Sequence, residues 1–128
     1  MGKFIVENVA EGMVTLKTPN ANYRNTFKLA GAAGGLAIGR RVTGTIHAPA
    51  WKADVVEQGG NYVEPLSGRP RRMQGNVLAV NPASNELTVH VGYDVTVKLP
   101  ERYKAAAFPV GARIAWDNIE VPTFTPGA

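Results

Sequence analysis

Two similar segments far apart in the chain constrain the fold more than any other feature of the sequence. Residues 23–29 are Tyr-Arg-Asn-Thr-Phe-Lys-Leu and residues 93–99 are Tyr-Asp-Val-Thr-Val-Lys-Leu, which are identical at four of seven positions. Two further pairs of segments align in the same order, 2–18 with 75–91 and 36–42 with 108–114. A chain made of two copies of one unit must fold into two similar substructures. We therefore predict an internal duplication of a unit of about 50 residues; the alternative is two unrelated β-meanders.

Both units carry the alternation of apolar and polar residues that is typical of half-buried β-strands. Residues 100–107 differ, because a proline and an acid followed by alanines predict a short helix. In the first unit, the glycine-rich segment 30–36 occupies the same position and is expected to be a turn or loop. The expected strands are 3–9, 12–18, 22–29, 40–47 and 51–57 in the first unit and 75–80, 87–91, 93–99, 112–116 and 119–121 in the second.

The resulting element order, β-β-β-α-β-β in each unit, resembles the OB-fold, and so does the entry to the fourth strand at 110–114. The resemblance is one of topology and covers nearly the whole chain twice. It implies an all-β protein of two duplicated five-stranded OB-like small barrels, which are separate, share one core or interlock into a single barrel. The expected domains are a first repeat at 1–66 with an extra hairpin of 51–57 with 62–66, a basic linker at 67–74, a second repeat at 75–123 and a flexible tail at 124–128.

Several function classes are excluded or disfavoured by the residues present. The absence of cysteine among the 128 residues excludes disulfides, cysteine-bound zinc and thiol nucleophiles. No apolar run reaches the roughly 20 residues that cross a bilayer, and no signal-peptide core precedes Glu7. The two histidines, His47 and His90, lack metal-ligand spacing, and Ser67 and Ser84 lie outside any nucleophile motif. We expect a soluble, cytoplasmic protein that is not an enzyme, with no cofactor, no metal and no membrane partner.

Positive charge is concentrated in the first part of the chain. Residues 1–74 carry ten Lys and Arg against five acids, whereas residues 75–128 carry four against five. A basic surface is the electrostatic property expected of a protein that binds phosphate groups, although ordinary solubilising charge is the alternative. We predict a binding module for single-stranded DNA or RNA. Its expected phosphate-binding residues are Arg24, Lys28, Arg40, Arg41, Arg69, Arg71 and Arg72, and its expected stacking residues are Trp51 and Tyr62.

Two other functions remain open. A structural or assembly protein, of a phage particle or another oligomer, would use exposed strand edges and the 124–128 tail to contact a second copy or a protein partner. A small-anion carrier is the third reading, because the chain is similar in length and duplication to tandem molbindin domains, and residues 71–77 look loosely like their entry sequence. The Ser-Ala-Arg-Asn motif of that family is absent. Its absence puts the anion-binding residues in doubt.

Overall fold

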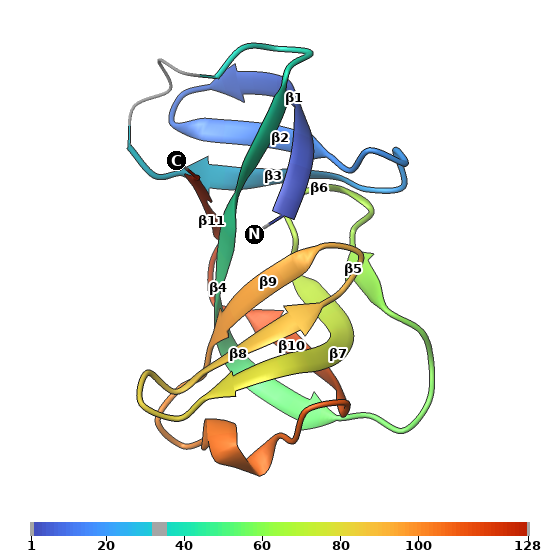
Figure 1. The fold of residues 1–128 in the computed structure, drawn as a ribbon, viewed down its shortest axis with the longest axis vertical. Helices are drawn as coiled ribbons and strands as arrows, with labels where there is room; N and C mark the ends of the chain where they lie inside the picture. The colour runs from blue at the N-terminus through green and yellow to red at the C-terminus, as the bar shows by residue number, and fades with distance from the viewer. Residues whose placement is uncertain (1, 32–35, 128) are drawn as a thin grey trace.

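The computed structural model describes residues 2–31 and 36–127 and confirms the all-β class. Among these residues, the elements labelled in Figure 1 are strands, and one short 3-10 helix accompanies them. Their bounds are β1 Gly2–Ala10, β2 Met13–Lys17, β3 Arg24–Leu29, β4 Arg41–Val55, β5 Tyr62–Glu64, β6 Ser67–Gly68, β7 Arg72–Asn81, β8 Glu86–His90, β9 Asp94–Lys98, β10 Arg113–Asn118 and β11 Thr123–Pro126.

The strand pairings close into two circuits, which are stacked along the long axis of the molecule in Figure 1. In the first circuit, barrel 1, the order is β1-β2-β3-β11-β4 and back to β1. In the second, barrel 2, it is β7-β8-β9-β4-β10 and back to β7. Within these circuits only the β3–β11 and β9–β4 pairs are parallel. Each barrel therefore has five strands in the same relative arrangement.

The two barrels exchange their fifth strands. Strand β4 is one continuous strand where the sequence predicted two: residues 41–47 pair with β1 and β11, and residues 46–55 pair with β9 and β10. In return, β11 from the end of the chain enters barrel 1. Each half of the chain thus supplies four strands to one barrel and a fifth strand to the other, so that the barrels interlock.

The pairing details of the two barrels also correspond. The β1–β2 register shifts between Val6 and Asn8, and the β7–β8 register shifts between Val77 and Ala79. Threonines lie opposite each other in both meanders, Thr15 with Thr26 and Thr88 with Thr96. The two barrels are therefore alike in their strand pairing. The internal duplication of the sequence stays a prediction.

The core contains the apolar faces that strand alternation predicted. Val95, Val97 and Leu99 of the second meander are buried, as are Val14 and Leu16 of the first. Burial of these side chains is the main favourable contribution to folding. Aromatic rings are in contact where the barrels meet, since the Tyr93 ring packs edge-on against the rings of Phe4, Phe27 and Tyr23.

The predicted helix at 100–107 is wrong. Only a 3-10 helix forms there, at Ala105–Ala107. The side chain of Asn85 explains the difference, because its Oδ1 accepts a hydrogen bond from the Ala105 N–H at 2.8 Å and its Nδ2 donates to the Tyr103 carbonyl at 3.0 Å. These bonds occupy backbone groups that a helix would pair internally.

Three other boundaries differ from expectation. The hairpin of 51–57 with 62–66 is wrong, since β5 pairs with β7 and the end of β4 pairs with β10. The strand expected at 119–121 is absent, and the tail expected to be flexible forms β11, in which Phe124 is fully buried between β3 and β4. The linker covers residues 69–71 rather than the predicted 67–74, because β6 ends at Gly68 and β7 begins at Arg72. In the segment 30–36, residues 32–35 lie outside the described part of the chain.

Candidate functional site

A cleft with a volume of about 460 Å³ lies between the linker 69–71 and the segment that follows β10. It forms because β10 ends at Asn118 and the chain leaves the sheet until β11 begins at Thr123. We call it the arginine cleft. Its lining residues are Arg69, Pro70, Arg71, Asp117, Asn118, Ile119, Glu120 and Val121.

Backbone and side-chain hydrogen bonds hold both walls of the arginine cleft in place. The Asn118 N–H donates to the Arg71 carbonyl at 2.9 Å, and the Asn118 Nδ2 donates to the Pro70 carbonyl at 3.1 Å. The Asn118 Oδ1 accepts a hydrogen bond from Nε1 of the buried Trp116 at 2.8 Å. Asn118 therefore connects the core of barrel 2 to the linker, and the positions of the two linker arginines follow from this connection.

Both acidic residues that line the cleft are paired with cations. Asp117 lies 3.0 Å from Arg72, and Glu120 lies 3.1 Å from Lys28. Arg69 and Arg71 are exposed and form no ion pair with an acid among residues 2–31 and 36–127. The cleft therefore carries a net positive charge that comes from these two arginines, and such a cleft attracts anions.

Arg72 stays protonated at the edge of the cleft. Hydrogen bonds to Tyr62 and to Asp117 raise its pKa above its usual value. Arg24 begins β3 opposite Ser67 of β6, and it also lies 3.7 Å from Glu7. The structure thus places Arg69 and Arg71 in the cleft. Arg72 and Lys28 form ion pairs with the two acids that line it. Tyr62 lies beside Arg72, and Arg24 lies next to the strand that leads into the linker.

The remaining predicted residues lie outside the cleft. Arg41 lines a separate groove together with Lys3, and Arg40 precedes β4 in a turn. Trp51 lies on β4 with 49% of its surface exposed. Sequence reasoning missed Arg102, whose guanidinium carbon lies 5.7 Å from the centre of the Trp51 ring. No signal in the sequence links these two residues, because Arg102 was assigned to a helix that does not form.

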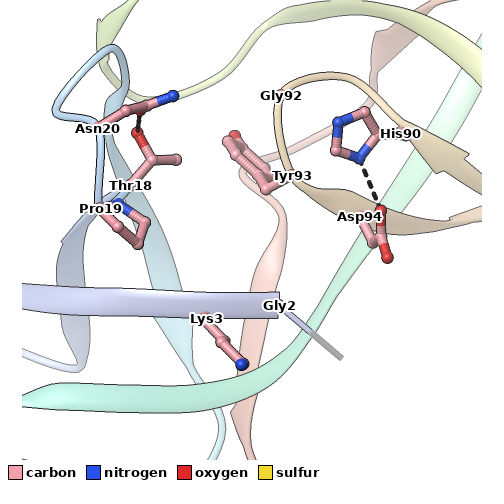
Figure 2. A pocket seen from close by; sticks show the side chains of 9 residues that line it. All are labelled: Gly2, Lys3, Thr18, Pro19, Asn20, His90, Gly92, Tyr93 and Asp94. Carbon is pink, nitrogen blue, oxygen red and sulfur yellow. Dashed lines mark hydrogen bonds and ion pairs between the residues drawn. The ribbon is translucent and has the colours of Figure 1, made fainter.

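A second pocket, of about 320 Å³, lies where the N-terminal end of β1 meets the loop between β8 and β9 (Figure 2). His90 and Asp94 lie on one side of it, with His90 Nδ1 2.8 Å from Asp94 Oδ1, and Thr18 and Asn20 lie on the other. Lys3 is the only lysine or arginine among its lining residues. None of the nine predicted site residues lines this pocket, so the predicted residues favour the arginine cleft as the candidate site.

Within the part of the chain that the structure describes, no group of three His, Cys, Asp or Glu residues is arranged to hold a metal ion. No helix among the described residues is long and apolar enough to cross a membrane. The chain matches no known family model, no curated protein and no solved structure.

Proposed function

We propose that this protein is a non-catalytic module that binds single-stranded nucleic acid, DNA or RNA, with backbone phosphates in the arginine cleft. The observation that carries the proposal is the pair of arginines, Arg69 and Arg71, in a cleft whose two acids are already neutralised by other cations. Guanidinium groups bind phosphate oxygens with two parallel hydrogen bonds, which makes arginine well suited to this ligand.

The sequence of the linker supports a repeating ligand. Arg69 and Arg71 are separated by Pro70, whose carbonyl is held by Asn118, so the two guanidinium groups belong to one restrained segment. A chain of phosphates can engage both guanidinium groups with successive phosphates. Binding to such a chain releases counterions and therefore weakens as salt increases.

A structural or assembly role is the second candidate. It is favoured by large apolar side chains that are exposed at the end of barrel 2, namely Leu78, Val110 and Val55. A backbone hydrogen bond from Gly111 to Val77 brings the first two of these segments together. Light scattering tests this candidate, because an assembly role requires a defined multimer.

Fluorescence anisotropy with a labelled oligo-dT or oligo-U strand of about 12 nucleotides, at about 50 mM and about 200 mM salt, tests the proposed function. We expect salt-dependent binding that the double substitution R69A/R71A weakens by at least about tenfold, with a lower salt slope. The matched control is R40A/R41A, which removes the same charge from exposed residues outside the cleft. Equal losses in the two variants would show that only total charge matters, and no binding of the unmodified protein at low salt would reject the proposal.

A further inference from the structure

Trp51 is exposed because of an irregularity in strand β4. In the β4–β10 pair, Lys52 lies opposite Asp117 and Ala50 lies opposite Asn118, so Trp51 has no partner. Ala50 and Ala53 on either side are each only 2% exposed, whereas Trp51 and Lys52 both point outward. A β-bulge has this effect, since the extra residue interrupts the alternation and re-aims a side chain.

The bulge lies in the part of β4 that pairs with the cleft residues of β10. Trp51 stands between Lys52, which is opposite Asp117, and Ala50, which is opposite Asn118, and both Asp117 and Asn118 line the arginine cleft. Residues that are directly opposite in an antiparallel pair project from the same face of the sheet, so Lys52 shares the face of Asp117. Trp51 is exposed next to Lys52 on β4, one strand away from the cleft residues Asp117 and Asn118 of β10, although Trp51 is not itself among the lining residues.

The indole ring is also held in position. The Arg102 guanidinium carbon lies 5.7 Å from the Trp51 ring centre and 5.1 Å from the Tyr103 ring centre, and Arg102 donates a hydrogen bond to the Trp51 carbonyl. These contacts are cation–π interactions, which favour this orientation of the ring. With 49% of its surface still exposed, Trp51 presents a large aromatic surface at little further cost in side-chain entropy.

We propose that Trp51 is a stacking platform for one unpaired base whose neighbouring phosphates lie in the arginine cleft, and that Arg102 is the positioning residue for this platform. The ligand is then a single strand rather than a duplex, because a base within a duplex is already stacked on its neighbours and has no open face. Any base fits, since every base has a π-face. This inference rests on the proposed function and adds a requirement for the base itself.

Paired ligands with and without bases test the requirement. The probes are oligo-dT of about 12 nucleotides and a strand of the same length and charge made of abasic residues. We expect the W51A variant to bind oligo-dT about 5- to 150-fold more weakly than the unmodified protein does, as the loss of one stacked base predicts. W51A should bind the abasic strand as the unmodified protein does, and W51F should retain most of the affinity for oligo-dT. The salt slope should not change in either variant, because stacking releases no counterions.

Intrinsic fluorescence gives a second readout. The chain has two tryptophans, and Trp116 is fully buried whereas Trp51 is half exposed. We expect oligo-dT to quench the emission of the unmodified protein and the abasic strand to leave it unchanged, with no quenching by oligo-dT in W51F. The R102M variant should weaken oligo-dT binding more than abasic-strand binding, as a positioning role requires.

The outcomes separate the two proposals. Normal oligo-dT binding by W51A, together with weak binding by R69A/R71A, would overturn the stacking platform and leave the proposed function intact. Duplex DNA that binds as tightly as the single strand would overturn the platform as well. If the unmodified protein binds neither oligo-dT nor the abasic strand, the proposed function fails and the platform fails with it. Thermal unfolding of each variant confirms that affinity losses do not come from loss of the fold.

Discussion

The Tyr93 hydroxyl donates a hydrogen bond to Asn25 Oδ1 at 2.8 Å, and this bond joins the two halves of the chain inside the core. Both residues are buried, and the Asn25 Nδ2 in turn donates to the Pro65 and Gly68 carbonyls at 3.1 Å each. The buried amide of Asn25 on β3 therefore contacts two other parts of the chain: residues 65–68, which contain β6, and Tyr93, which precedes β9. The arrangement bears on the proposed function because the linker that begins after Gly68 carries the cleft arginines.

Removal of the Tyr93 hydroxyl should destabilise the protein. In Y93F the ring packing against Phe4 and Phe27 remains, but Asn25 Oδ1 loses its buried partner. An unsatisfied buried acceptor costs about 1–3 kcal/mol, so we expect the free energy of unfolding in urea to fall by that amount. Y103F, at a half-buried tyrosine before the 3-10 helix, is the control, and an equal loss there would argue against a special role for the Tyr93–Asn25 bond.

Tyr93 should also make stability depend on alkaline pH. Burial, and to a lesser extent the nearby Tyr23, raises the pKa of Tyr93 well above its usual value. The raised pKa means that the folded protein favours the neutral phenol, so this contribution is complete below about pH 10, where an unfolded tyrosine titrates. This contribution to the free energy of unfolding is lost as the pH rises from about 10 toward the pKa of Tyr93 in the folded protein. Unfolding measured from pH 8 to pH 11.5 should show a steeper decline for the unmodified protein than for Y93F, and parallel curves would contradict this account.

Gly75 on β7 should not tolerate a side chain. A Cβ there would overlap the His90 carbonyl oxygen and contact a Val91 methyl group at 2.9 Å. Such overpacking costs about 1–3 kcal/mol, so G75A should lower the midpoint of urea unfolding. G60A is the control, because nothing lies within 4 Å of a Cβ at Gly60. Equal stability of G75A and G60A would contradict the close approach of β7 and β8 at Gly75.

The strand exchange predicts that two fragments of the chain remain associated. A protease site inserted between Gly59 and Gly60, in an exposed loop, divides the chain into pieces that each carry a strand needed by the other barrel. Because β4 completes barrel 2 and β11 completes barrel 1, we expect the cleaved pieces to elute together in size-exclusion chromatography. After separation in urea, neither piece should fold alone, and folded separate fragments would show that the exchange is not needed for stability.

Neutralising an acid of the arginine cleft should strengthen nucleic-acid binding. E120Q removes a negative charge from the cleft wall and leaves Lys28 without its partner at 3.1 Å. At low salt we expect oligo-dT to bind about 2- to 5-fold more tightly, with the gain lost at high salt. Stability should change by less than about 1 kcal/mol, because this ion pair is at the surface. The control is E101Q, an exposed acid outside the cleft, and a similar gain there would indicate a general effect of charge.

Local patterns in the sequence determined the strands and their buried faces. Alternation predicted a half-buried strand at 93–99, in which Val95, Val97 and Leu99 are buried, and the predicted phosphate-binding residues Arg69 and Arg71 line the cleft. These features could be predicted because period-two alternation and charge density are properties of short segments. The helix at 100–107 could not be judged in this way, since the side chain of Asn85 from a distant turn decides its backbone hydrogen bonds.

Only the tertiary structure decided which barrel receives each fifth strand and which cations are neutralised. The alternation in residues 51–55 is the same whether they pair with β10 or with β5, and nothing local marks Phe124 as a core residue of barrel 1. Likewise, Arg72 and Arg71 are neighbours in sequence, yet only Arg72 lies beside Asp117. Strand pairing and ion pairing join residues that are far apart along the chain, and their partners are therefore set by the packing of the whole molecule rather than by any short segment.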